Sequence, residues 1–167
     1  MPLPERAISI RFPWCALILG EQKGVEVRGR LAHHRGPLVL HCPRGVSPEH
    51  LGRLRATRPD LWRWVTSPRS PLWHHWPGVT GPEDILGRAI GVVDLLDCRP
   101  ATEGDTEAAL VRPGLVYPSP WALVLAHPRW LPVPVPLRGQ VFATWQLGDQ
   151  AAGLWSAVRQ ARADRAA

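Results

Sequence analysis

The sequence contains a single lysine, Lys23, although 20 of its 167 residues are basic. The other 19 basic residues are arginines, whose guanidinium groups stay protonated in proteins. A lone lysine in such a chain indicates a position that needs a compact amine able to lose its proton. A chance lysine at an exposed position is the alternative interpretation.

Cysteines are few, and Cys15, Cys42 and Cys98 form no C-x-x-C pair. An odd number without paired spacing argues against a disulfide framework and is typical of a reducing compartment. No apolar run approaches the ~18 residues that cross a bilayer, and the first residues show no secretion signal. We therefore expect a cytoplasmic protein with no membrane contact.

Several motifs of enzymes and metal sites are missing. The glycines do not form a G-x-x-x-x-G-K-[ST] phosphate loop, and no G-x-S-x-G elbow occurs. The histidine pairs at 33–34 and 74–75, with His41 and Cys42, do not have the four-ligand spacing of a structural zinc site. We expect no cofactor and no metal ion.

The composition indicates one basic domain with a hydrophobic core. Hydrophobic residues make up 45% of the chain, which excludes wholesale disorder, and the length fits a single domain. The formal net charge of +6 favours polyanionic partners, and RNA or DNA is the class we expect.

Periodicity predicts many short strands and a few helices. We expect strands at 7–11, 25–28, 38–42, 85–98, 121–126 and 130–135, and helices at 14–22, 47–57 and 149–163. Residues 60–82 show no clear period and are expected to form a packed loop. The segment 140–147 is a last strand or a turn, and the alternating prolines at 132–136 require a sheet edge. This pattern favours an α+β fold, with a small, strongly bent mixed β-barrel flanked by helices.

Three stretches together resemble the ASCH (activating signal cointegrator homology) domain of the PUA-like superfamily. Ile8–Trp14, ISIRFPW, resembles the family's opening S-x-x-x-P-W. Gly20–Arg28, GEQKGVEVR, resembles its K-x-x-E-x-R signature, and Ile85–Cys98, ILGRAIGVVDLLDC, resembles its glycine-broken central strand. The resemblance implies an ASCH domain over residues 1–148, followed by a C-terminal helix at 149–167 that packs on the domain or extends from it.

The resemblance also implies two kinds of function. The cointegrator branch resembles a nucleic-acid-binding module with a basic cleft, which suggests a role in transcription or RNA metabolism. Other members are hydrolases: one group deacylates acetylated cytidine, and another has been assigned ribonuclease activity. Lys23 matches the catalytic lysine of the deacylases, but Glu26 stands where they carry a threonine nucleophile, and this departure favours the binding branch.

Lys23, Glu26 and Arg28 form the central constellation. Glu26 and Arg28 share one face of a strand, because side chains alternate with a period of two, and Lys23 lies at the turn before them. A carboxylate between two cations stays ionised and can accept hydrogen bonds from a base or a ribose hydroxyl. In an enzyme, Lys23 and Glu26 would be the catalytic pair. The same residues would equally form a structural salt bridge at the end of the barrel.

Other candidate nucleic-acid contacts surround this constellation. They are Ser9, Arg11 and Trp14 upstream, and the basic loop residues Arg30, His34 and Arg35 downstream. Arginines can pair with phosphates, and a tryptophan can stack on a base. Trp14 is more often a core residue in such a position, and Ser9 could instead bond to neighbouring backbone.

We therefore expect a nucleic-acid-binding module, with a hydrolase that uses Lys23 as the alternative. A third hypothesis is an adaptor that binds a protein partner through the Trp-rich region Trp62–Trp76. Four tryptophans there would form either an exposed patch or a satellite core. RNA versus DNA and one strand versus two remain open at this point.

Overall fold

A computed structural model describes residues 3–76, 78–140 and 143–167. The strands are β1 (Arg6–Ser9), β2 (Val25–Arg28), β3 (Gly36–Cys42), β4 (Arg88–Pro100), β5 (Trp121–Pro136) and β6 (Trp145–Gln146). The α-helices are α1 (Trp14–Leu19), α2 (Pro48–Thr57), α3 (Pro59–Thr66), α4 (Thr106–Ala109) and α5 (Gln150–Ala166). Short 3₁₀ turns are η1 (Pro71–His75), η2 (Pro82–Asp84), η3 (Glu103–Asp105) and η4 (Pro113–Leu115). No helix in these ranges is both long and apolar enough to span a membrane.

The six strands form one mixed sheet in the order β2-β5-β4-β3-β1-β6. β1 and β3 run parallel, and the other neighbouring pairs run antiparallel. Within the described part of the chain, the end strands β2 and β6 do not pair, so the sheet is open. The expected α+β class is confirmed, but the closed barrel is not.

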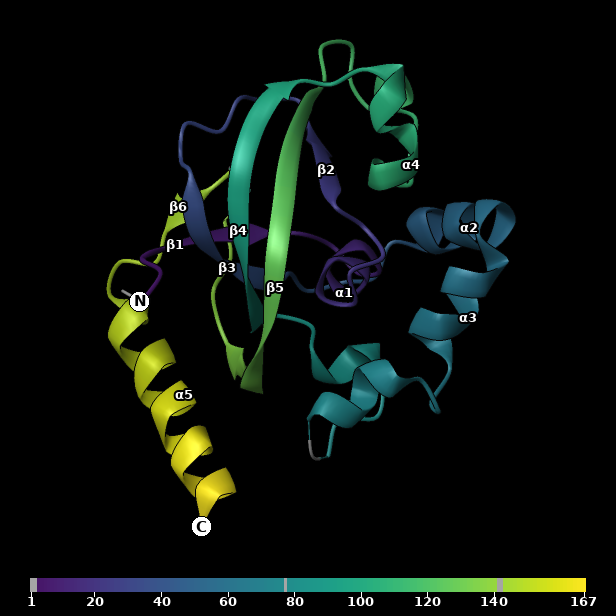
Figure 1. The fold of residues 1–167 in the computed structure, drawn as a ribbon. Coiled ribbons are helices and arrows are strands. Elements are labelled where there is room, and N and C mark those ends of the chain that lie inside the picture. The colour runs from purple at the N-terminus through teal and green to yellow at the C-terminus, as the bar shows by residue number, and fades with distance from the viewer. Residues whose placement is uncertain (1–2, 77, 141–142) are drawn as a thin grey trace.

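The sheet is bent along its two longest strands, as Figure 1 shows for β4 and β5. Their antiparallel register shifts three times, and each irregularity increases the local twist. A Cβ at Gly91 would overlap the side chain of Leu19, so a glycine is needed where α1 packs against β4. This bend brings β2 back towards β1, and Arg28 Nη2 donates to the carbonyl of Ser9 at 2.5 Å.

Hydrophobic side chains fill a core on each face of the sheet. In β3, Leu38 and Leu40 join the cluster that contains Leu17 of α1, whereas Val39 joins the cluster that contains Trp155 of α5. This alternation follows from the two-residue period of a strand. In Figure 1, α2 and α3 lie to one side of the sheet, and α5 lies to the other, with its C-terminal end directed away from the body.

The expected strand at 25–28 and the helix ending at Thr57 match β2 and α2, but two other expectations were wrong. Residues 60–82 contain the helix α3, because Pro59 occupies its first turn and Leu61 and Val65 are buried on one face. The two strands expected around position 127 are one strand, β5, whose irregular register accommodates His127 at a φ of 50°.

The alternating prolines lie at a sheet edge, as expected, but only part of their strand forms that edge. β5 lies inside the sheet, but β2 pairs only with Trp121–Val124. The proline-rich half pairs with β4 on one side and, among the described residues, with no strand on the other. The segment expected at 140–147 contains the short strand β6, and its residues 141–142 lie outside the described part.

The Trp-rich region does not form the exposed patch that an adaptor would require. Trp73 and Trp76 are buried, and Trp62 and Trp64 are half-buried against the main core. Trp76 Nε1 also donates to the carbonyl of Leu131 at 2.8 Å, which fixes its ring beneath the sheet edge. These tryptophans therefore form a satellite of the core.

Candidate functional site

A cavity of about 990 Å³ opens where the bent sheet brings β2 close to β1. Six of the nine sequence candidates line it: Ser9, Arg11, Trp14, Lys23, Glu26 and Arg28. The other charged lining residues are Arg44, Arg53 and Arg138, so Glu26 is the one carboxylate among the described lining residues. A recess with this excess of fixed positive charge attracts anions.

Lys23 is buried and holds three parts of the chain together. Its Nζ donates to the carbonyl of Val25 at 2.6 Å and to that of Ala109, the last residue of α4, at 2.5 Å. The same Nζ lies 3.5 Å from a carboxylate oxygen of Glu26. Burial lowers the pKa of Lys23, and the charge of Glu26 opposes this shift. Three acceptors match the three N–H groups of an ammonium, so the geometry suits an anchor.

Glu26 lies between two cations. Its second carboxylate oxygen is 3.2 Å from Arg28 Nε, and the Glu26 residue is only 9% exposed. Arg28 also donates to the Ser9 carbonyl, so one guanidinium joins the carboxylate to β1. A carboxylate fixed in this way retains lone pairs for donors on a ligand.

Ser9 forms a second polar cluster in the cavity with a residue that the sequence analysis had considered only as a metal ligand. Its Oγ is 2.9 Å from His41 Nδ1 and accepts from Trp145 Nε1 at 3.1 Å. An indole can only donate, so Ser9 Oγ is the acceptor towards Trp145, while the direction of its bond with His41 Nδ1 is set by the tautomer of the imidazole. Burial lowers the pKa of His41 to about 4, so its ring is neutral at pH 7. A Cβ at Gly139 would overlap the His41 ring, so this backbone lies directly against the pair.

The aromatic wall of the cavity differs from the sequence expectation. Trp14 is only 7% exposed and its ring packs near His50 and the Lys23 ammonium, so it belongs to the core. Tyr117 is half-buried, lines the cavity and lies against Gly29, where a Cβ would meet its ring. Tyr117 is the only tyrosine in the chain, which was the one signal that could have singled it out.

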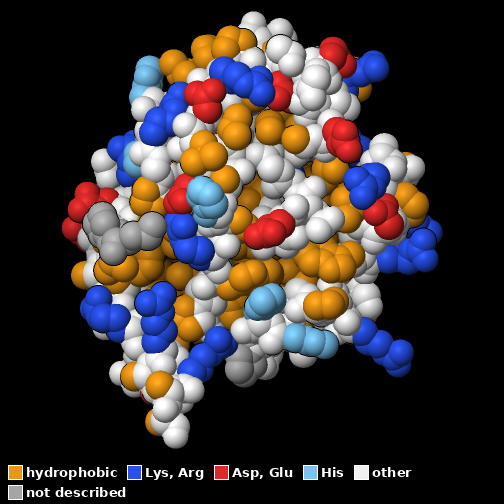
Figure 2. Space-filling model, in the orientation of Figure 1, with side chains coloured by type: hydrophobic (Ala, Val, Ile, Leu, Met, Phe, Trp, Pro, Cys, Tyr) orange, Lys and Arg blue, Asp and Glu red, His pale blue; other side chains and the backbone are white. Residues whose placement is uncertain are grey.

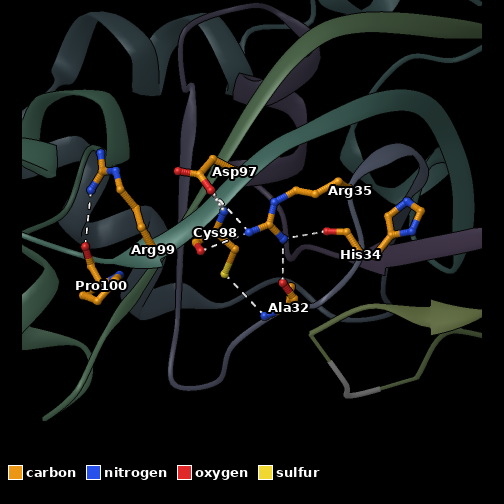
Figure 3. Close-up of polar contacts among 7 residues, drawn as sticks. All are labelled: Ala32, His34, Arg35, Asp97, Cys98, Arg99 and Pro100. Carbon is orange, nitrogen blue, oxygen red and sulfur yellow. Dashed lines mark hydrogen bonds and ion pairs between the residues drawn. The ribbon is translucent and has the colours of Figure 1, made fainter.

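Three of the sequence candidates do not line this cavity. The Arg35 guanidinium donates to the carbonyls of Ala32 and His34, each at 2.8 Å, and lies 3.3 Å from Asp97 Oδ1. Figure 3 shows these contacts, which connect the loop after β2 to β4. Arg30 and His34 line a second cavity of about 430 Å³.

Other lining residues were missed as site candidates. Arg138 and Gly139 lie just after β5 and line the cavity, and no sequence signal singled them out as site residues. Arg53 lies in α2, and Arg44 lies shortly before this helix. Both reach the cavity only through tertiary packing. Within the described ranges, no group of three His, Cys, Asp or Glu side chains could hold a metal ion.

Figure 2 shows a mixed surface in the same orientation as Figure 1. Hydrophobic side chains form a band across this face, and lysine or arginine side chains are distributed around the band. On this face, positive charge is therefore spread widely and is not confined to one patch.

Comparisons with known proteins identify the fold. No protein-family model matches the sequence, and no curated protein matches it either. Among solved structures, the chain is similar to a crystal structure of ZmASCH from Zymomonas mobilis, determined as a serine-to-alanine mutant. The TM-score is 0.52 at 13% sequence identity, and the match covers 93% of this chain and 99% of the other. The open, bent sheet and its helices therefore have the fold of this ASCH protein, as the sequence motifs indicate.

Proposed function

We propose that the larger cavity binds RNA or DNA, mainly through the nucleic-acid backbone. The observation that carries this proposal is the charge of the cavity wall, which has five arginines and Lys23 against the single carboxylate of Glu26. Neutralising phosphates releases counterions from the nucleic acid, and this release drives binding at low salt. The net charge of +6 acts in the same direction.

Three of these arginines are suited to phosphate contacts. Arg11, Arg44 and Arg138 are exposed, and none forms an ion pair with a carboxylate in the described ranges. A guanidinium that is not already neutralised can bind a phosphate through two parallel N–H bonds. Lys23 and Arg28, by contrast, are engaged by Glu26 and by backbone carbonyls.

Glu26 and Tyr117 supply contacts for a base. The fixed carboxylate of Glu26 can accept from the amino or imino groups of a base edge. The ring of Tyr117 offers a stacking surface, and stacking of a base on an aromatic side chain is worth about 1–3 kcal/mol. This combination places the backbone at the rim and a base inside.

A binding experiment with matched variants tests the proposal. End-labelled single-stranded RNA, single-stranded DNA and duplex DNA are each run on a native and a denaturing gel. The double variant Arg11→Ala/Arg138→Ala is compared with Arg159→Ala/Arg162→Ala, which removes the same charge from exposed positions on α5. We expect intact, retarded strands, a log–log salt slope of about −3 to −5, and weaker binding only for the cavity variant. Equal binding by both variants would contradict the proposal.

The alternative function is hydrolysis of a nucleic acid or a modified nucleoside. One observation favours it: Lys23 is buried beside Glu26, and burial lowers the pKa of its amine. The three acceptors around Nζ favour an anchoring role instead. The denaturing gel tests this alternative. If the wild type shortens the strands and a folded Lys23→Met protein leaves them intact, the protein is a hydrolase.

We further propose that residues 1–148 are the binding domain and that 149–167 is a helix packed on it. Leu154, Trp155 and Val158 are buried against the sheet, and Trp155 Nε1 donates to the Pro4 carbonyl at 3.2 Å. These contacts support packing on the domain. A chain that ends at residue 148 is expected to unfold at lower temperature and still bind.

A further inference from the structure

The smaller cavity, of about 430 Å³, is lined by basic residues and histidines. Arg6, Arg30, His33 and His34 contribute to its wall, beside Leu31, Ala32, Ala143 and Thr144. The lining contains no carboxylate, and none of the four basic or imidazole side chains pairs with a carboxylate elsewhere in the described ranges. The cavity therefore has positive charge that the protein itself does not neutralise.

One atom in this cavity wall lacks a partner. Arg6 Nη1 donates to the side-chain oxygen of Gln146 at 2.8 Å, and Nη2 makes a long contact of 3.5 Å with Thr144 Oγ1. Arg6 Nε is buried and makes no hydrogen bond within the described ranges. A buried donor without an acceptor is costly, and an anion would satisfy it. A guanidinium with unused donors suits a phosphate group.

The two cavities are neighbours along two separate segments of the chain. In β1, Arg6 lines the smaller cavity and Ser9 the larger one, so about 10 Å of strand separates them. After β2, Arg28 lines the larger cavity and Arg30 the smaller one, at most about 7 Å apart. The hydrogen bond from Arg28 to the Ser9 carbonyl lies between these pairs.

This spacing corresponds to a few nucleotides. Nucleotides along one strand of a duplex rise about 3.4 Å each, so 7–10 Å corresponds to about two or three of them. A base can enter the larger cavity only if it leaves a stack, because Glu26 and Ser9 lie in a recess and not on an open groove. Recognition of unstacked bases is characteristic of single strands.

From this arrangement we infer that the smaller cavity binds a second phosphate of the same single strand whose base occupies the larger cavity. This inference rests on the proposed function and adds a path and a minimum length for the ligand. The strand crosses the Arg28–Ser9 contact and places a phosphate between Arg6 and Arg30. The ligand that reaches both cavities is then an oligonucleotide of at least about three nucleotides, and not a mononucleoside.

The test measures the affinity for one sequence as a function of length. Fluorescein-labelled oligo-U and oligo-dT of two, four, six and eight nucleotides are titrated by anisotropy at several salt concentrations. The variants are Arg30→Ala at the smaller cavity, Arg11→Ala at the larger cavity, and Arg162→Ala on α5 as the matched control. Arg30 and Arg162 are exposed, so their removal is compatible with folding.

We expect affinity to rise from two nucleotides to about four to six and then to level off. Arg30→Ala should weaken the octamer several-fold, reduce its salt slope by about 0.7, and leave the dinucleotide unchanged. Arg11→Ala should weaken both lengths, and Arg162→Ala neither.

Two outcomes would overturn the inference, and they differ from a failure of the proposed function. If Arg11→Ala weakens binding but Arg30→Ala equals Arg162→Ala on the octamer, the larger cavity binds and the smaller one does not. If duplex binds as tightly as the single strand, the proposed path is wrong. If no oligonucleotide binds the wild type at low salt, both the proposed function and this inference are wrong.

Discussion

Arg28 joins β2 to β1 through the carbonyl of Ser9, although three strands separate β2 from β1 in the sheet. The same guanidinium holds Glu26 at 3.2 Å. A side chain thus bridges the bend where hydrogen-bonded strand pairing does not, and the larger cavity opens at this bridge. Stability and ligand binding therefore depend on the same contact.

Replacing Arg28 by methionine should lower the free energy of unfolding. The change removes a charged hydrogen bond and leaves Glu26 with Lys23 as its one neighbouring cation, and hydrogen bonds to charged groups contribute about 1.5–3 kcal/mol. Urea denaturation followed by tryptophan fluorescence measures the change, with Arg162→Met as the control. An unchanged midpoint would show that the bridge contributes nothing to stability.

Replacing Lys23 by methionine should destabilise the protein more strongly. The carbonyls of Val25 and Ala109 lose their donor, and Glu26 loses one of its two cations. Removing one partner of a buried ion pair typically costs about 3–5 kcal/mol. Denaturation curves of Lys23→Met and of Lys23→Met/Glu26→Gln measure this loss of stability. The double variant should recover part of the loss, because its buried carboxylate is also removed.

Asp105 should make stability sensitive to acid. Hydrogen bonds from Arg99, together with those from Thr102, lower the pKa of Asp105 to about 2, against 3.8 for an ordinary aspartate. The folded state therefore holds this proton less tightly than the unfolded state. The stabilisation is complete above about pH 4 and is lost as the pH falls towards 2. Asp105→Asn should remove this part of the pH dependence from urea midpoints measured between pH 5 and 2.

His41 should stay neutral well below the usual range of histidine. Burial lowers its pKa to about 4, so its ring resonances in a two-dimensional NMR titration should not move between pH 7.5 and 5.5. The folded state binds this proton less tightly than the unfolded state, whose pKa is near 6.5. Stability is therefore lost as the pH falls from about 6.5 to about 4. A ring that titrates near pH 6.5 would contradict the buried Ser9–His41 pair.

The same substitution at two glycines should have opposite effects. Gly139→Ala places a methyl group against the His41 ring and Ser9, and should lower both stability and oligonucleotide affinity. Gly153→Ala lies in α5 with open space around it, and should stabilise the helix by about 0.5–1 kcal/mol. Thermal unfolding and anisotropy of the two variants provide the comparison. Equal effects would show that the close approach at Gly139 is not required.

Local chemistry made some elements predictable. Ser47 accepts from the amide of His50 at the start of α2, as a serine followed by proline indicates. The alternating residues from Val25 to Arg28 form β2 with the bounds that the pattern predicts. α3 was not predicted because a proline soon after a helix usually marks its end, whereas Pro59 also begins the next helix.

The site was predictable where its residues are close in sequence. Lys23, Glu26 and Arg28 meet because they lie within six residues of one another on a turn and a strand. Tyr117 and His41 reach the same cavity from distant segments, and nothing in their local sequence encodes that meeting. Tertiary packing decides such contacts, and a single sequence carries little information about it.

The burial of the single lysine makes its amine a chemical reporter of local opening. Lys23 is just 4% exposed, so reagents that acylate amines reach Nζ when the groups that cover it move away, and the carbonyl of Ala109 is one of them. Residues 103–117, which carry Tyr117 into the cavity wall, contain that carbonyl. The rate at which Lys23 is labelled would therefore follow the opening of this wall, without interference from any other lysine.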